Sequence, residues 1–386
     1  MAEPFKNLIN AQTVHSAREH LARVWRGFDG ARFEALALAG LDALELKARV
    51  LHLCAALEAT LPDDFDRAAG ILESSLAPPL PGEDLGALRT SEAGLAGWIV
   101  WSMGEFVARR GLQQPERALM ALHALTQRST AEFAIRPFIV AHPQLSFATL
   151  MAWTRDPSAH VRRLVSEGSR PRLPWGLQLK ALIADPGPTL PLLHALQDDA
   201  SPYVRRSVAN HLNDIARDNP GVFTQWLAQH LPEASAERRT LLKHASRTLI
   251  KRGHAPVLKA WGLGQRYRGE AVLSIRPKQV ELGGSVTLEL SLQSGAAKPQ
   301  PLVIDYVVHH VKADGSTSPK VFKGWSLTLP AQGQQTLTKI HSLKPVTTRR
   351  YFAGPHTVEI QVNGSVVSSH SFLLKNRSLS HSGSGP

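Results

Sequence analysis

The sequence is poor in cysteine and in long apolar runs, and each shortage excludes a class of protein. Its 386 residues contain one cysteine, Cys54, which excludes an intramolecular disulfide framework and a CxxC-type zinc or iron–sulfur site. No segment reaches the ~18 consecutive apolar residues of a membrane helix, and the start, MAEPFKNLIN, lacks the apolar core of a secretion signal. These absences predict a reducing, cytoplasmic setting without membrane contact.

Acidic residues become scarce in the middle of the chain. Residues 1–149 hold 14 Lys/Arg and 17 Asp/Glu, whereas residues 150–269 hold 18 and 9, and residues 270–386 hold 12 and 6. Of the 18 cations in the middle part, 14 are arginine, whose planar fork suits phosphate. This distribution predicts that the later part of the chain contacts a polyanion. A solvated basic face is the alternative that charge alone leaves open.

Residues 9 to about 265 show the spacing of consecutive helices, with an internal repeat in the basic part. DPSAHVRRLV at 156–165 matches DASPYVRRSV at 199–208, an offset of 43 residues. An Asp before a turn, followed by Val-Arg-Arg in the next helix at that period, is typical of HEAT-type helical pairs. A solenoid needs about three or more repeats, so the helical flanks of these two copies are expected to supply degenerate ones.

After Gly269 the pattern changes from helical spacing to strict alternation. VTLELSL at 286–292 and HTVEIQV at 356–362 alternate, and the pairs Gly283-Gly284, Asp314-Gly315 and Asn363-Gly364 are turn signals. Roughly seven short strands indicate an immunoglobulin-like sandwich. The expected fold is therefore mainly α, a HEAT-like helical-repeat solenoid (1–265) followed by a C-terminal all-β immunoglobulin-like sandwich (270–375) and a disordered tail (376–386).

The repeat predicts one solvent-facing side shared by both copies. Val204, Val208, Leu212 and Ile215 form the buried stripe of the second copy, which turns Asp214 and Arg217 outward. The exposed residues that the offset superposes are Arg163 and Arg206, Glu167 and Asn210, and Arg170 and Asn213. This surface combines arginine, carboxylate and amide groups. A solvated helix face with incidental i,i+4 pairs is the competing explanation.

Three carboxylates are the candidate catalytic groups. Glu167 lies at the C-terminal end of its helix, where the helix dipole disfavours an anion by ~0.3–1 kcal/mol, so a purely stabilising role needs a compensating arginine. Asp214 lies inside its helix, where Asp is a poor helix former. Glu132 is ambiguous, because Ser129-Thr130-Ala131-Glu132 has the form of a capping box.

An aromatic residue follows the first repeat helix in the connector GSRPRLPW. Pro174 predicts the start of a new helix, which places Trp175 at a loop–helix junction, close to Arg170 and Arg172. An indole there suits stacking on a cationic nucleobase, although a core position is the alternative. Trp101, Trp153, Trp226 and Trp261 lie in apolar runs and are expected in the core. No HExxH, P-loop or GxSxG motif is present, and the scattered histidines indicate no metal pair.

The runs EFAIRPFI, VRRLVSEGSRPRLPWG and SPYVRRSVANHLNDIARDNP resemble the DNA alkylation-repair glycosylases of the AlkC and AlkD superfamily. The C-terminal β-domain makes the chain similar to the AlkC branch. The resemblance implies a DNA glycosylase that removes N3-methylated bases, 3-methyladenine and 3-methylcytosine, from duplex DNA without base flipping. It places acidic lesion-site positions at Glu132, Glu167 and Asp214 and an aromatic contact at Trp175. Arg163, Arg170, Arg172, Arg206, Asn210 and Asn213 are the implied DNA-binding residues.

The chemistry of such a reaction requires no metal or cofactor, because N3-methylation makes the base a cationic leaving group. A carboxylate beside the sugar would stabilise the developing oxocarbenium ion and position a water molecule. The predicted surface holds no lysine for a Schiff base, so we expect a monofunctional, monomeric hydrolase acting on alkylated double-stranded DNA. The alternative is a non-catalytic helical-repeat scaffold that binds nucleic acid or a protein partner.

Overall fold

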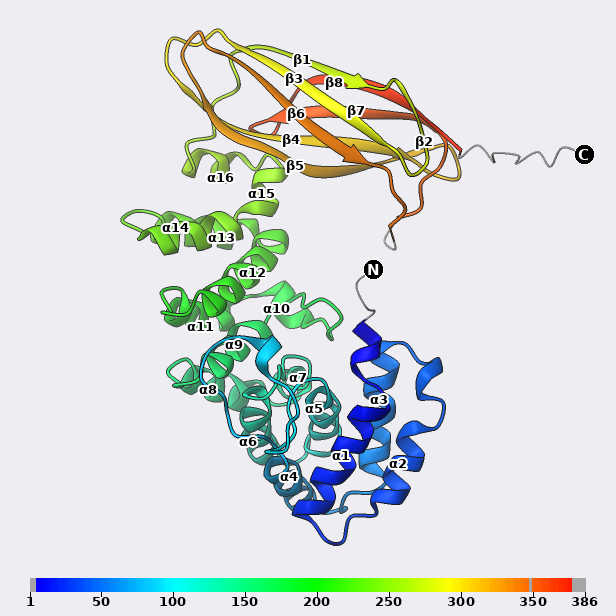
Figure 1. Ribbon diagram of the computed structural model, residues 1–386. Helices are drawn as coiled ribbons and strands as arrows, with labels where there is room; N and C mark the ends of the chain where they lie inside the picture. The colour runs from blue at the N-terminus through cyan, green and yellow to red at the C-terminus, as the bar shows by residue number, and fades with distance from the viewer. Residues whose placement is uncertain (1–4, 347–348, 377–386) are drawn as a thin grey trace, which may run out of the picture. The chain divides into compact units, whose positions relative to one another are not determined.

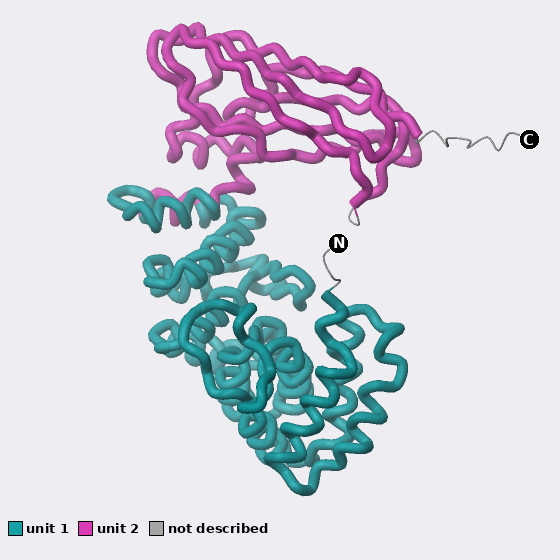
Figure 2. Tube along the Cα trace, viewed as in Figure 1, with its two compact units in different colours: residues 1–223, 230–245 teal, residues 224–229, 246–386 magenta. Residues whose placement is uncertain are grey.

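The computed structural model describes residues 5–346 and 349–376, which form two compact units (Figure 2). The first unit holds the described residues up to Phe223 together with residues 230–245. The second holds residues 224–229 and the described residues from Ser246 onward. The predicted tail falls almost entirely on residues 377–386, which lie outside the described residues.

The first unit is helical throughout, as the spacing of apolar residues predicts (Figure 1). Its helices are mostly short and follow one another through brief connections, apart from the longer segments 75–98 and 169–179, which is the pattern of a helical-repeat array. In chain order they are α1 (Ala11–Val24), α2 (Gly30–Leu38), α3 (Leu46–Glu58), α4 (Phe65–Ser74), α5 (Ile99–Arg110), α6 (Pro115–Thr126), α7 (Arg136–Ala141), α8 (Pro143–Trp153), α9 (Ala159–Gly168), α10 (Lys180–Ala184), α11 (Leu190–Leu196), α12 (Pro202–Asp218), α13 (Pro220–His230), which is shared with the second unit, and α14 (Ala236–Ala245).

The two sequence copies form matching turns before α9 and α12. Asp156 Oδ1 accepts a hydrogen bond from the main-chain N–H of Ser158 at 2.8 Å, and Asp199 Oδ1 accepts one from Ser201 at 2.9 Å. Arg162 joins the copies, because its Nε lies 2.6 Å from Asp199 Oδ2. The aspartates therefore fix where each helix begins, and the helical-repeat prediction is confirmed.

The interior of the first unit is apolar and contains the single thiol of the chain. The predicted stripe of α12 is buried, with Val204, Val208 and Leu212 at 0% exposure. Cys54 of α3 is equally buried, and burial raises the pKa of its thiol to about 12. Among the described residues, no helix is both long and apolar enough to cross a membrane.

The second unit combines two short helices with a two-sheet β structure (Figure 1). One sheet has the order β1-β3-β6 and the other the order β2-β8-β7-β4-β5. The elements are α15 (Arg247–Lys251), α16 (Ala255–Ala260), β1 (Gly269–Arg276), β2 (Gln279–Glu281), β3 (Ser285–Ser294), β4 (Gln300–Val311), β5 (Thr317–Leu329), β6 (Gln334–Ser342), β7 (Gly354–Val362) and β8 (Ser365–Lys375).

Alternation along the strands builds the core of the second unit. Leu288 and Leu290 of β3 and Val358 and Ile360 of β7 are fully buried, and the residues between them face outward or are half-buried. The tight turn between β7 and β8 uses the predicted Asn-Gly pair, whose φ angles of 48° and 78° are both positive. The predicted β-sandwich class is therefore confirmed.

The predicted domain limits of 1–265 and 270–375 stay predictions. Compact packing divides the chain before α15, so that residues 246–265 group with the strands that follow them. The sequence placed the limit where helical spacing gives way to alternation. The residue at which helices give way to strands need not be the residue at which the chain begins to pack with the second unit. The two boundaries therefore differ.

Candidate active site

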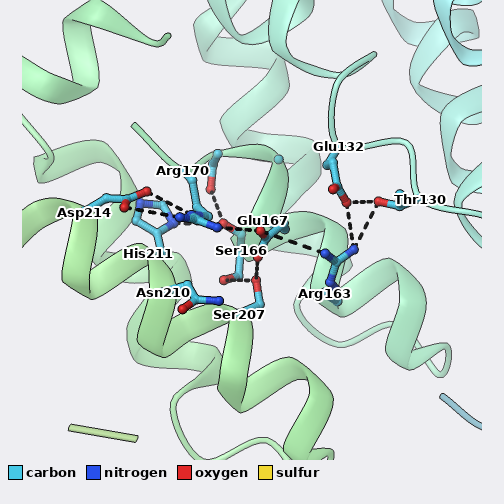
Figure 3. A network of polar contacts seen from close by, with 12 residues as sticks. Thr130, Glu132, Arg163, Ser166, Glu167, Arg170, Ser207, Asn210, His211 and Asp214 are labelled. Atoms are coloured by element: carbon cyan, nitrogen blue, oxygen red, sulfur yellow. Dashed lines mark hydrogen bonds and ion pairs between the residues drawn. The ribbon is translucent and has the colours of Figure 1, made fainter. Parts of the chain in front are cut away.

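A chain of oppositely charged side chains lies between the end of α9 and the middle of α12 (Figure 3). Glu167, Arg170 and Asp214 are only 6–7% exposed. The expectation of a solvent-facing surface at these positions is therefore wrong. The two helices pack against each other, and Ser166 Oγ of α9 lies 2.9 Å from Ser207 Oγ of α12, so each covers the face that a single helical wheel assigns to water.

Arg170 is the centre of this network. Its Nε donates to Asp214 Oδ2 at 2.9 Å and its Nη2 to Asp214 Oδ1 at 3.2 Å, a bidentate pair. Its Nη1 donates to Glu167 Oε1 at 2.6 Å, and the hydroxyl of Ser207 donates to Glu167 Oε2 at 2.6 Å. The compensating arginine that a carboxylate at the end of a helix requires is thus present, and both oxygens of each acid are occupied.

Arg163 extends the network to a third carboxylate. Its Nη1 donates to Glu132 Oε2 at 2.7 Å, its Nη2 lies 3.9 Å from Glu167 Oε1, and the guanidinium sits 5.1 Å above the ring of Tyr203. Glu132 also accepts from the hydroxyl of Thr130. Carboxylates and guanidiniums therefore alternate in the order Glu132, Arg163, Glu167, Arg170, Asp214.

The capping role that sequence offers for Glu132 is wrong. Residues 132–135 form turns, α7 begins only at Arg136, and its N-cap residue, Ile135, makes no side-chain cap. The carboxylate of Glu132 is instead directed to Arg163 and is 8% exposed. With helix initiation removed as an explanation, this acid belongs with the charged network.

The three carboxyls differ in acidity although they are neighbours. Burial raises the pKa of Glu132 and of Asp214 above their ordinary values, in spite of the arginines beside them. Burial acts on Glu167 as well, but Arg163 and Arg170 together hold its pKa below the ordinary value. Glu167 is therefore the carboxylate that stays ionised most firmly. Environments that push neighbouring pKa values apart allow one acid to carry charge while another exchanges a proton.

A pocket of about 400 Å³ opens in front of this network. Carboxylates Glu132 and Glu167 and the guanidinium of Arg170 form part of its wall, and Asp214 lies outside it. Trp101 and Phe133 stack with ring centroids 4.8 Å apart and line the same space. The remaining lining residues are Leu85, Leu88, Gly97, Trp98, Ser129, Thr130, Leu173, Pro174 and Trp175. The pocket is thus acidic on one side and aromatic on others.

Trp175 stands at the edge of this pocket in an uncommon backbone conformation. Its φ is +64°, and its side chain is 68% exposed, which excludes the core position. The predicted helix start at Pro174 is wrong, because the chain continues without regular structure until α10 begins at Lys180. A bulky residue held in the left-handed region is a strained arrangement, of the kind that gathers at functional sites.

A lysine comes close to the pocket from a distant part of the sequence. Lys47 of α3 lies with its Nζ 3.4 Å from the main-chain oxygen of Trp175. Lys47 lies outside the surface of the two repeat helices, for which the sequence predicts no lysine, and it does not line the pocket.

The predicted DNA-binding residues fall into two groups. Arg163 and Arg170 have side chains only 15% and 9% exposed and are engaged by carboxylates, and Arg172 Nε lies 2.5 Å from Asp218 Oδ2. Asn213 is buried, and Asn210 Oδ1 lies 3.0 Å from His244 Nε2. Arg206 is exposed and lines a groove between α12 and α14. Of the four predicted arginines, Arg206 is the one that is exposed.

Sequence reasoning missed several residues that the fold brings to this site. Trp98 lines the pocket, although nothing in its local sequence separates it from core tryptophans. His211 is fully buried beside the network, its Nδ1 lies 2.9 Å from the Ser166 carbonyl oxygen, and burial lowers its pKa to about 3. Arg136 is also fully buried, and the one signal for it in the sequence is a lone arginine before proline in EFAIRPFI, a run that carries the family resemblance. Within the described residues, no cluster of three or more His, Cys, Asp or Glu side chains could hold a metal ion.

Known proteins share both the sequence and the fold of this chain. Residues 270–376 match the family described as YhaZ, C-terminal Ig-like domain. The YhaZ protein of Bacillus subtilis (strain 168) is 35% identical over 375 residues, which cover 96% of this chain and 99% of that protein. The solved structure of the Pseudomonas fluorescens alkylpurine DNA glycosylase AlkC, bound to DNA containing an abasic site analogue, matches with a TM-score of 0.87 and 33% identity. That match covers 97% of this chain and 100% of the AlkC chain.

Proposed function

Because this chain belongs to the family that includes YhaZ and the DNA glycosylase AlkC, as the sequence motifs indicated, we propose that it is itself a DNA glycosylase. Its proposed reaction is hydrolysis of the N-glycosidic bond of N3-alkylated bases, 3-methyladenine and 3-methylcytosine, in duplex DNA. The lesion is approached without base flipping, and the abasic product starts base excision repair. The protein is proposed to act as a monomer.

The observation that carries this proposal is the pairing of buried, differently acidic carboxylates with an aromatic-lined pocket. A scaffold that merely binds nucleic acid has no chemical use for Glu132, Glu167 and Asp214 in its interior, and burying charge is costly even where arginines pair with it, as they do here. An enzyme that breaks a glycosidic bond uses such groups, because positive charge develops at C1′ as the base leaves. The AlkC neighbour was solved with an abasic site analogue, which corresponds to the product of this chemistry.

Glu167 is the residue that we assign to oxocarbenium stabilisation. It lines the pocket, and its lowered pKa keeps it anionic. Glu132 lines the same pocket and has a raised pKa. It is placed to orient the attacking water molecule or to accept a proton from it. Asp214 meets Arg170 with both oxygens, so within the proposed catalytic set it acts by holding that arginine.

Trp175 is proposed to contact the alkylated base. An exposed indole at the pocket edge offers a π-face, and a cationic base is attracted to it more strongly than a neutral one. This preference matches the leaving group, because N3-alkylation gives the base its positive charge. Arg206 is proposed to contact the DNA backbone.

Hydrolysis without strand cleavage stays part of the proposal despite the nearby lysine. Lys47 is exposed and directed to the Trp175 main-chain oxygen, and it does not line the pocket. Treatment of the reaction with borohydride should therefore trap no covalent adduct with abasic DNA. An adduct that disappears in Lys47→Ala would show a lyase step instead.

The decisive experiment is incubation of the full chain with methylated duplex DNA and chromatography of the released bases. Release of free 3-methyladenine supports the proposal. Tight DNA binding without release of any base would favour the non-catalytic scaffold.

A further inference from the structure

Arg136 is a fully buried cation, and its guanidinium donates hydrogen bonds to main-chain oxygens of a single segment of the chain. Its side chain is 0% exposed and is the largest of the fully buried side chains among the described residues. Nε donates to the Leu177 carbonyl at 2.5 Å, and Nη1 donates to those of Gly168 and Arg170, both at 2.8 Å. All these acceptors lie in residues 168–177, hereafter the connector.

The connector needs such a donor because, beyond Gly168 at the end of α9, it has no regular structure of its own. Carbonyl groups released at the end of α9 have no helical N–H partners, and buried carbonyls require hydrogen bonds from elsewhere. The planar guanidinium supplies several donors in a fixed geometry, which a lysine ammonium does not reproduce. One conformation of the connector is thereby selected.

Burial of this arginine is not explained by an ion pair. Within the described chain, no carboxylate lies within ion-pair distance of Arg136, because the nearby acids pair with Arg163 and Arg170. Burial and the charge of Arg170 lower the pKa of Arg136 to about 10, although Asp214, Glu132 and Glu167 oppose this shift from a greater distance. A cation kept in the interior without a contacting anion is an expensive way to stabilise a fold. The free-energy cost of burying this cation has a functional reason where activity depends on the conformation of the connector.

We propose that Arg136 is a positioning residue of the base-excision site, an inference that rests on the proposed function. The connector carries Arg170, which bridges Glu167 and Asp214, and it also carries Trp175 in its left-handed conformation. Arg136 therefore acts through both: it sets the distance between the acids and the direction in which the indole leaves the backbone. It contacts neither substrate nor water in this role.

Arg136→Lys tests the proposal because it retains the positive charge and removes the planar guanidinium group with its several donors. We expect the single-turnover rate of 3-methyladenine release to fall by about tenfold or more, while affinity for undamaged duplex changes by less than about threefold. A second readout concerns Trp175 alone: iodide quenching of each protein is compared with that of its Trp175→Phe version. Arg136→Lys should alter this difference signal, because the indole is no longer held in place.

Arg49→Lys is the matched control. Arg49 is also buried, at 4% exposure, and donates to main-chain oxygens, those of Leu44, Ile9 and Asp42, outside the connector. It should lower the melting temperature and leave the Trp175 signal and the excision rate near the parent values. Equal losses in both variants, or an unchanged rate and signal in Arg136→Lys, would overturn the proposal.

Gly176→Ala provides an independent variant if Arg136→Lys does not fold. A Cβ at this position would lie 3.2 Å from Cδ2 of Leu173 and 3.4 Å from Cδ and Nε of Arg136, so the added methyl group crowds the connector beside Arg136 without removing the charge. The same changes are expected at smaller amplitude, and a parent-like rate and quenching signal would contradict the role. If the parent protein releases no base at all, the proposed function fails, and the quenching difference still decides whether Arg136 sets the position of Trp175.

Discussion

Arg170 holds both carboxylate oxygens of Asp214, at 2.9 Å and 3.2 Å, while its remaining terminal nitrogen holds Glu167 at 2.6 Å. One side chain from an irregular connector thus fixes the separation of two acids on different helices. Loss of either acid should therefore affect the other, and the two substitutions should be far from additive.

Asp214→Asn should reduce single-turnover base release by about tenfold to a hundredfold, with DNA affinity nearly unchanged. The amide cannot pair with both Nε and Nη2 of Arg170, so the arginine loses its orientation. Asp218→Asn is the matched control, because Asp218 lies on the same helix and pairs with Arg172 at 2.5 Å, away from Glu167. Excision by Asp214→Asn within about twofold of the parent would refute the assignment.

Glu167→Gln should be the more damaging carboxylate substitution, with a loss of about a hundredfold or more. Gln keeps the shape and a hydrogen bond to Ser207 but removes the anion that faces C1′ in the proposed mechanism. Glu73→Gln, which breaks a surface pair with Arg117 at 2.6 Å, serves as control. Rapid-quench measurement of base release compares Glu167→Gln with Asp214→Asn. A smaller loss in Glu167→Gln than in Asp214→Asn would reverse the roles proposed for the two acids.

Trp175→Gly should separate contact with the lesion from stability. At φ +64°, glycine avoids the left-handed strain that costs an L-residue ~1–2 kcal/mol, so the melting temperature should hold or rise. Excision should nevertheless fall by about tenfold, because the exposed indole is lost. Thermal unfolding and excision measured on the same sample test this opposition. A protein that melts earlier and excises normally would assign Trp175 a structural role.

Arg206→Ala and Arg163→Ala should have different consequences, although the repeat superposes the two residues. Arg206 is exposed, so its loss should reduce the slope of log K against log salt by about one unit on damaged and undamaged DNA alike. Arg163 pairs with Glu132 at 2.7 Å inside the protein, so its loss should lower stability and excision more than the salt slope. Titrations at several salt concentrations distinguish them, and identical slopes would contradict the separation.

The second unit should lose stability as the pH falls below about 6.5. His310, His341 and His356 are buried, and burial lowers their pKa values, to about 3 for His310 and about 4 for His341. Between pH 6.5 and 4 these two histidines bind more protons in the unfolded chain than in the folded one, so His310 and His341 each remove up to about 1.4 kcal/mol of stability per pH unit on acidification, and the lowered pKa of His356 acts in the same direction. His356→Phe should flatten the pH dependence of unfolding, whereas His370→Gln, an exposed change, should leave it unaltered.

Sequence predicted the fold better than the surroundings of the site. Helical spacing, strand alternation and the Asn363-Gly364 turn are local signals, and they placed both classes of structure correctly. The repeat offset also selected Glu167 and Arg170, yet it assigned them to solvent. A helical wheel gives direction around one axis but not what packs against it. Arg136 donates hydrogen bonds to carbonyl oxygens more than 30 residues further along the chain, and the local spacing of residue types does not predict such contacts.

The buried thiol of Cys54 has a practical consequence for following this protein in action. Because the pKa of this thiol is raised to about 12 and Cys54 is 0% exposed, it should not react with maleimide reagents at neutral pH. Exposed positions changed to cysteine, such as Met120 in the first unit and Ile340 in the second, would then be the sole reactive thiols. Fluorophores attached to both positions would report, by energy transfer, how the separation of the two units changes when duplex DNA is added.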